Sequence, residues 1–141
     1  VVMPKCYTRS VWMFDYKIAD LEKPLYEFLK KCCPIAFGRI AYDEDKPNTG
    51  RLINDPSHAK KLFSLAELPD VSIDHYIHCS FQELDLFPYS AIPTDDSPLI
   101  FLHQIALKDG TLLAFGAHHH LTDGHGFFSL IDRFARWICN K

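Results

Sequence analysis

Two long apolar runs that flank an Asp-Gly pair restrict the possible folds more than any other part of this sequence. They lie in residues 99–121, LIFLHQIALKDGTLLAFGAHHHL, on either side of Lys108, Asp109 and Gly110. An Asp-Gly pair between apolar runs is a strong short-range signal for a β-hairpin. The runs are nearly continuous in apolar residues rather than alternating, as is typical of strands covered on both faces. The segment therefore predicts two central strands of a sheet.

The segments around this hairpin predict helices and further strands that would cover it. The aromatic and β-branched run at 7–16 is expected to form a strand. Two short strands are expected on either side of a polar turn at 43–50. Helices are expected over 20–34, 57–68 and 126–138, and an extended surface loop over 87–98. The predicted fold class is α/β, a two-layer α+β arrangement in which helices pack on a mixed, mostly antiparallel sheet.

Capping residues and prolines set the expected helix ends. Asp20 and Ser57 are candidate N-caps of the first two helices, and Pro34 and Pro69 limit them on the carboxyl side. The last helix carries an apolar stripe at helical spacing, formed by Phe127, Leu130, Ile131, Phe134 and Ile138. We expect this stripe to pack on the sheet.

Composition and charge indicate one globular domain over residues 1–141. Hydrophobic residues make up 48% of the chain and charged residues 23%, which is ordinary for a folded domain. The net charge is −3 and no basic stripe occurs, so nucleic acid is not an expected partner. No apolar run approaches the roughly 18 residues of a membrane span. No signal peptide is visible and the five cysteines form no Cys-x-x-Cys pair, which favours a cytoplasmic protein with reduced thiols.

A histidine cluster lies where the second strand of the hairpin gives way to the last helix. Residues 117–126 read AHHHLTDGHG. Histidine titrates near neutral pH, so such a cluster suits proton transfer or metal binding. If the strand continues through the cluster, His118 and His120 lie on one face and His119 on the other.

Three kinds of site can be built from these residues. In a metal site, His118 and His120 would share an ion, with Asp123 or His125 as the third ligand. The remaining histidines lack ligand spacing, so we expect no metal. A nucleophilic triad is not favoured, because the sequence contains no Gly-x-Ser-x-Gly turn. The nearby serine, Ser129, lies on the polar face of the last helix. The third kind uses one histidine as a general base.

The spacing of the cluster favours a general base. Residues 118–124, HHHLTDG, fit H-H-x-x-x-D-G with the second motif histidine at His119. This resembles the motif of the coenzyme A-dependent acyltransferase superfamily, which includes chloramphenicol acetyltransferase, condensation domains of peptide synthetases and BAHD-type transferases of plants and fungi.

The surrounding segments resemble the BAHD-type family in particular. GFFSLIDRFARW follows the motif, and LEKPLYEFLKKCCPIAFGRI looks like that family's helix and Pro-x-x-x-Gly-Arg turn, here Pro34, Gly38 and Arg39. The likeness covers most of 7–137 and corresponds to the amino-terminal half of the fold.

The resemblance implies a role for each motif residue. His119 would be the catalytic base that takes a proton from the acceptor's hydroxyl or amine while it attacks an acyl thioester. Asp123 would be structural, pointing away from the substrate and pairing with an arginine. Gly124 would let the backbone turn tightly beside the reaction tunnel. His118 and His120 would line the pocket, and acyl-coenzyme A is the implied co-substrate, with no bound cofactor.

Each of these residues also has a purely structural interpretation, which the sequence leaves open. His119 could be a buried, hydrogen-bonded core histidine. Asp123 could be a helix cap or a turn residue, and Gly124 and Gly126 could be ordinary glycines at a helix start.

The second half of a BAHD-type fold has no counterpart in this chain. Such enzymes carry an Asp-Phe-Gly-Trp-Gly motif in a second domain, and nothing here matches it. The chain begins VVMPKC, without an initiator methionine, and ends directly after the last predicted helix. We therefore expect a fragment that supplies the base and one wall of the tunnel, with the missing carboxyl-terminal half as its partner.

Two other functions remain open on the sequence alone. The chain could be a non-catalytic, truncated acyltransferase-like domain that binds small molecules or a partner. It could also be a condensation-type half-domain that acts on carrier-protein thioesters.

Overall fold

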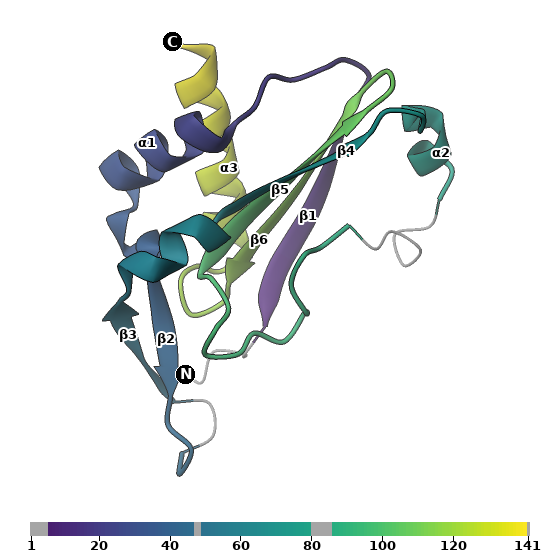
Figure 1. Cartoon of the computed structure of the whole chain (residues 1–141). Helices are drawn as coiled ribbons and strands as arrows, with labels where there is room; N and C mark the ends of the chain where they lie inside the picture. The colour runs from purple at the N-terminus through teal and green to yellow at the C-terminus, as the bar shows by residue number, and fades with distance from the viewer. Residues whose placement is uncertain (1–5, 47–48, 80–85, 141) are drawn as a thin grey trace.

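The centre of the molecule is a four-stranded sheet with the strand order β1-β6-β5-β4 (Figure 1). The computed structural model describes residues 6–46, 49–79 and 86–140. The β1–β6 and β5–β6 pairs are antiparallel, and β4 runs parallel to β5. The strands are β1 (Tyr7–Phe14), β4 (Phe63–Leu68), β5 (Ile100–Leu107) and β6 (Thr111–His118). The predicted mixed, mostly antiparallel sheet is confirmed.

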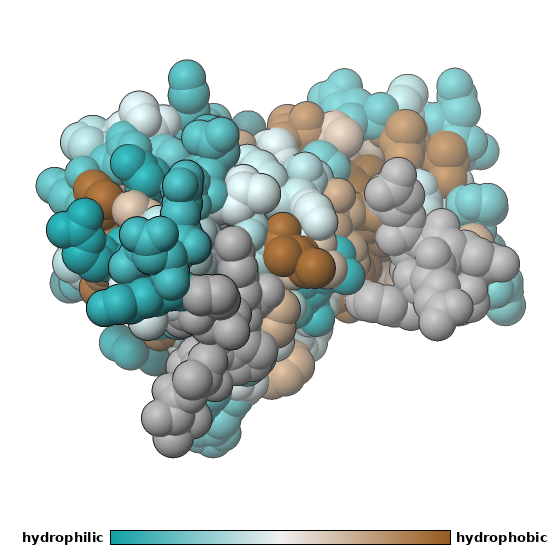
Figure 2. Space-filling view, turned by 90° about the horizontal axis from the view of Figure 1, so that it is seen from below, coloured by the Kyte–Doolittle hydropathy of each residue, from teal (hydrophilic) through white to brown (hydrophobic). Residues whose placement is uncertain are grey.

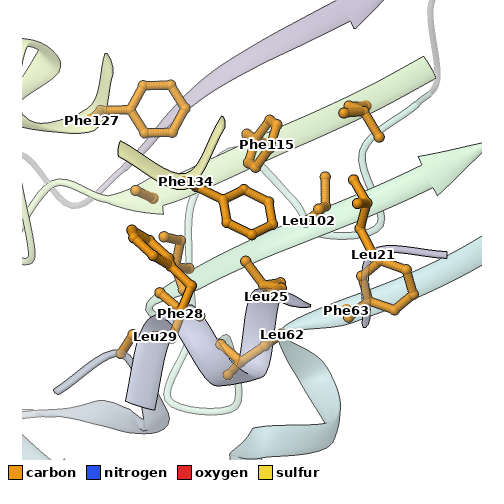
Figure 3. Packing of buried hydrophobic residues seen from close by; sticks show 14 residues of the cluster. Leu21, Leu25, Phe28, Leu29, Leu62, Phe63, Leu102, Phe115, Phe127 and Phe134 are labelled. Carbon is orange, nitrogen blue, oxygen red and sulfur yellow. The ribbon is translucent and has the colours of Figure 1, made fainter. Parts of the chain in front are cut away.

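Two helices form the second layer, α1 (Glu22–Cys32) and α3 (Gly124–Cys139), and both pack on the same face of the sheet (Figure 1). Their side chains converge over β5 and β6 (Figure 3). The rings of Phe28 and Phe134 lie 5.3 Å apart, and Phe115 of β6 lies 6.4 Å from Phe134. Burial of each such ring stabilises the fold by about 1.5–3 kcal/mol. The core therefore fixes α3 over the end of β6.

The opposite face of the hairpin carries a smaller apolar cluster. It is covered by the short helix α2 (Ile73–Ile77), which the sequence did not predict, and by the chain at 86–98. That segment has no helix or strand, as predicted, and the Tyr7 hydroxyl donates a hydrogen bond to its Pro98 carbonyl. Every residue of β6 is buried, so the prediction of a hairpin covered on both faces is confirmed.

The predicted helix over 57–68 is wrong. This segment forms a 3-10 helix, η2 (Pro56–Lys61), followed by strand β4. Asp55 rather than Ser57 is its N-cap, and its carboxylate accepts a hydrogen bond from the Ser57 amide at 3.2 Å. The physical reason is tertiary pairing. β4 forms hydrogen bonds along the edge of β5, and just before β4 the Leu62 carbonyl accepts a hydrogen bond from the Leu102 amide at 2.8 Å. Local helical spacing does not outweigh that ladder of hydrogen bonds.

The two short strands predicted around the polar turn are confirmed as β2 (Gly38–Tyr42) and β3 (Gly50–Asn54). They form a separate two-stranded ribbon that lies at one end of the molecule, below α1 in Figure 1. Pro34 ends α1 as predicted, and a 3-10 helix, η1 (Pro34–Phe37), leads into β2. The ribbon brings Tyr42 to the end of β6 that carries the histidines.

Side-chain hydrogen bonds hold the amino-terminal end of α1 in place. The N-cap of α1 is Leu21 rather than the predicted Asp20, although the Asp20 carboxylate accepts a hydrogen bond from the Glu22 amide at 2.8 Å. Buried Gln104 accepts a hydrogen bond from the Leu21 amide at 3.0 Å, which ties the start of α1 to the sheet. The predicted last helix is confirmed but starts at Gly124. None of the helices in the described part of the chain is long and apolar enough to cross a membrane.

Replacement of Gly116 tests how closely the hairpin is packed. Gly116 lies opposite Phe101, and a Cβ atom there would come within 2.2 Å of the Phe101 ring. The ring cannot easily retreat, because the rings of Tyr7 and Tyr89 lie 5.3 and 5.2 Å from it. We expect Gly116→Ala to lower the free energy of unfolding by about 1–3 kcal/mol in a denaturant titration.

Gly124→Ala is the matched control, because a Cβ atom at that position would meet nothing within 4 Å. Equal stability of the two variants would show that the hairpin tolerates a side chain at Gly116.

Candidate functional site

The motif residues lie in a turn between β6 and α3. The strand ends at His118, whose carbonyl accepts hydrogen bonds from the amides of Leu121 at 2.8 Å and Thr122 at 3.2 Å. The His118 amide donates to the Leu99 carbonyl at 2.7 Å. Because the strand ends here, the face alternation expected of a continuing strand does not apply to the three histidines.

His118 is buried, at 2% exposed, and its ring joins three parts of the chain. Its Nε2 contacts the hydroxyl of Tyr42, and its Nδ1 accepts a hydrogen bond from the His120 amide at 3.0 Å. The ring of Tyr7 packs edge-on against it at 5.9 Å. The rings of His118 and His120 lie 4.8 Å apart, so the structure brings together the two histidines that were expected to line a pocket.

Tyr42 was not singled out by the sequence. Its contact with His118 spans 76 residues, and no local motif or spacing marks it. Burial, together with the charge of Asp95, raises the pKa of the Tyr42 phenol to about 12. The hydroxyl therefore stays protonated at neutral pH.

His119 lies between these two histidines and is half-buried. Its amide donates to the Cys6 carbonyl at 2.9 Å, just before β1 begins. Its Nδ1 is buried and has no hydrogen-bond partner among the described residues. Buried polar atoms are nearly always paired, and an unmet one costs about 1–3 kcal/mol. Among the described residues, this nitrogen is thus a buried polar atom of the motif that is left without a hydrogen bond.

Asp123 is exposed and is the N-cap of α3. Its Oδ1 accepts a hydrogen bond from the Gly126 amide at 2.7 Å, and its carbonyl accepts from Phe127 at 2.9 Å. Within the described ranges no arginine pairs with Asp123; Arg39 pairs with Asp55 at 2.9 Å instead. The geometry of Asp123 is that of a helix cap, which the sequence left open as an alternative.

Gly126, rather than Gly124, is the glycine that local packing requires. A Cβ atom at Gly126 would lie 2.0 Å from the Thr122 hydroxyl and 3.2 Å from Asp123 Oδ1. No such contact exists for Gly124. No spacing in the sequence marks Gly126, because the constraint comes from the position of the Thr122 side chain.

One hollow lies beside the motif turn, and a larger groove lies along α3. The hollow, of about 280 Å³, is bounded by Cys33, Ile35 and Leu52 and by His120 and Gly126 of the motif region. The larger groove, of about 520 Å³, runs between α3 and strands β1 and β6. Its lining is mainly apolar and includes Trp12, Phe14, Phe128, Ile131 and Ile138. Figure 2, in which the molecule is seen from below, shows that apolar patches also reach the surface between polar side chains.

Other reactive groups lie apart from this turn. Within residues 6–46, 49–79 and 86–140, no group of three or more His, Cys, Asp or Glu side chains could hold a metal ion. Ser129 is exposed on α3, as expected. Burial lowers the pKa of His58, which packs near Asp55, and of His103, which bonds Ser64 at 2.6 Å.

Comparison with solved structures finds this fold in other proteins. The structure of F. graminearum TRI101 complexed with coenzyme A and T-2 mycotoxin matches 97% of this chain, with a TM-score of 0.71 and 15% identity. SgcC5 from Streptomyces globisporus matches 95%, with a TM-score of 0.62 and 14% identity. The epimerization domain from the third module of tyrocidine synthetase B matches 94%, with a TM-score of 0.62 and 17% identity.

This chain spans only about a third of each of those proteins, 36%, 30% and 30% of their lengths. No family model matches the sequence, and the search of curated proteins finds no relative. At these identities the structural likeness shows a shared fold. The predicted fold class is confirmed, and the coverage agrees with one half of a two-part fold.

Removal of the α3 cap tests the structural part of the motif. Asp123→Ala deletes the acceptor of the Gly126 amide, so we expect a loss of about 1 kcal/mol in unfolding free energy. Asp132→Ala is the control, because Asp132 is an exposed residue of the same helix that pairs with Arg136 at 2.9 Å. Such an exposed pair contributes about 0.3–0.5 kcal/mol. Thermal or urea unfolding that ranks the two variants the other way would contradict the capping role.

Proposed function

We propose that this chain is the amino-terminal half of a BAHD-type, coenzyme A-dependent acyltransferase that acylates a hydroxyl or amine of a small molecule. The observation that carries the proposal is the H-H-x-x-x-D-G turn, placed between a buried strand and α3 in a fold shared with TRI101. The TRI101 structure holds coenzyme A and a T-2 mycotoxin acceptor. The co-substrate proposed for this chain is accordingly acyl-coenzyme A.

In the proposed reaction His119 is the general base. Its imidazole takes the proton from the acceptor's O–H or N–H while that oxygen or nitrogen attacks the thioester carbonyl. The carbon–sulfur bond then breaks, the acyl group stays on the acceptor, and the proton leaves with coenzyme A as its thiol. A positioned base of this kind contributes roughly 10²–10⁴ in rate.

The remaining motif residues have supporting roles in this proposal. Asp123 and Gly126 fix the start of α3, and His118 holds the turn from the buried side. His120 faces the hollow of about 280 Å³ and forms part of the pocket wall. Gly124 stays a proposed backbone position beside the tunnel.

A condensation-type half-domain using carrier-protein thioesters is the second candidate, because the epimerization domain of tyrocidine synthetase B shares the fold. Its TM-score of 0.62 is lower than the 0.71 of TRI101, so the small-molecule acyltransferase is preferred. A non-catalytic binding domain would retain the fold without turnover.

Replacement of the base tests the function directly. In the complete enzyme that contains this chain, we expect His119→Ala to lower kcat/KM by about 10²–10⁴, measured as thiol release from acyl-coenzyme A with a panel of alcohols and amines. His125→Ala is the control, because His125 is an exposed residue of the next turn. Retained activity in His119→Ala would remove the base assignment.

We expect the isolated chain to catalyse thiol release from acyl-coenzyme A only weakly. Holding two substrates in attack geometry is worth roughly 7–11 kcal/mol, and the second half would supply much of it. Ordinary turnover by the isolated chain would contradict the two-half proposal.

The groove between β1 and α3 supports the missing half as a partner. Its exposed apolar side chains include Phe128, at 52% exposed, and Trp12, and exposed apolar surface of this kind marks interaction sites. We expect the isolated chain to self-associate in light scattering and Phe128→Glu to reduce that association.

Ile92→Glu is the matched control, since Ile92 is 64% exposed but lies outside the groove. A monodisperse monomer at all concentrations would contradict the role of the groove.

A further inference from the structure

Apolar side chains from η1 and β3 and the motif turn itself enclose the hollow of about 280 Å³. We propose that this hollow holds the uncharged, apolar body of the acceptor, and that Ile35 and Leu52 are the side chains that select this class of acceptor. The inference rests on the acyl transfer proposed above, because it names the kind of acceptor for the same site.

One part of the lining comes from the motif turn. His120, Leu121 and Thr122, which all line the hollow, are the three residues that directly follow the proposed base, His119. A molecule that fills the hollow therefore lies against the turn that carries the base. The acceptor is the substrate that must reach this turn, because His119 takes its proton.

Another part of the lining comes from two elements that precede the motif in the chain. Ile35 of η1 is 47% exposed, and Leu52 of β3 is 46% exposed. Single exposed apolar side chains are common on protein surfaces. These two, however, line the same hollow as the motif turn. An apolar molecule bound there would shield both of them from water.

The lining sets the class of molecule that the hollow can hold. Among the described residues that line it, none is Lys, Arg, Asp or Glu. Burial raises the pKa of the Cys33 thiol, which also lines the hollow, so this group stays neutral at neutral pH. A carboxylate or phosphate placed there would lose hydration without gaining a Lys or Arg partner. The lining therefore favours an uncharged, apolar molecule.

Size and charge separate the acceptor from the acyl donor. The volume of about 280 Å³ lies near the lower end of the roughly 300–1,000 Å³ of ligand pockets. Coenzyme A carries a nucleotide and its phosphates, which suit neither this volume nor this lining. A single ring or a short branched alkyl group suits both. The hollow is therefore assigned to the acceptor.

Methyl NMR of the 141-residue chain with benzyl alcohol as the probe tests the assignment. We expect benzyl alcohol to shift the methyl resonances of Ile35, Leu52 and Leu121. Benzoate has the same ring and a negative charge, so we expect it to bind about five- to tenfold more weakly.

Replacement of Leu52 by lysine tests whether this side chain selects the ligand. Leu52→Lys removes an apolar contact and supplies a cation, so we expect about five- to tenfold weaker binding of benzyl alcohol and correspondingly tighter binding of benzoate. A loss of structure would weaken both ligands instead. Ile35→Lys should give the same reversal, which keeps the test decisive if Leu52→Lys does not fold.

Ile92→Lys is the matched control, because Ile92 is 64% exposed but does not line the hollow. It should leave the preference for benzyl alcohol over benzoate unchanged.

Kinetics of the complete enzyme distinguish the acceptor from the acyl group. We expect Leu52→Lys to raise KM for uncharged alcohol acceptors about five- to tenfold and to leave KM for acyl-coenzyme A unchanged. A change confined to KM for acyl-coenzyme A would place the acyl chain in the hollow and overturn the assignment.

Two NMR results would also overturn it. One is a set of benzyl alcohol shifts confined to the larger groove, at Leu113 and Ile131. The other is a preference for benzyl alcohol that neither Leu52→Lys nor Ile35→Lys reverses. The NMR readout needs no turnover, so its failure differs from loss of the proposed function, which thiol release by the complete enzyme and its His119→Ala variant measures.

Discussion

Burial of β6 along its whole length is the constraint on which the rest of the structure depends. The strand pairs with β1 on one side and β5 on the other, and apolar clusters cover both of its faces. A strand so enclosed can carry a polar side chain only where partners are supplied. Thr111 and His118 are two such side chains: Thr111 donates to the Tyr16 carbonyl, and His118 contacts Tyr42 and the His120 amide. The position of the motif turn follows from where this enclosed strand ends.

The same constraint explains what could be predicted from the sequence. The apolar runs around Asp109 and Gly110 and the stripe on α3 are strong local signals, and the structure confirms the elements that they predict. The helix predicted over 57–68 is wrong because strand β4 in this segment forms by pairing with the edge of β5, which lies more than 30 residues away in the chain. No local pattern in that segment contains this information.

In the candidate site too, local spacing could be predicted from the sequence, whereas contacts between distant segments could not. The spacing of the motif placed His118, His119 and Asp123 together, and they do lie in one turn before α3. The contact of Tyr42 with His118 could not be found from sequence, because it exists only after the β2–β3 ribbon folds against the end of β6. The preference for Gly126 over Gly124 also needed coordinates, since it rests on a close approach to the Thr122 hydroxyl.

The bond between the His119 amide and the Cys6 carbonyl joins the motif turn to the residue just before β1. An affinity tag fused directly ahead of Cys6, or a deletion that reaches it, would remove or shift the acceptor of that amide. The start of β1 is therefore part of the support of the motif turn.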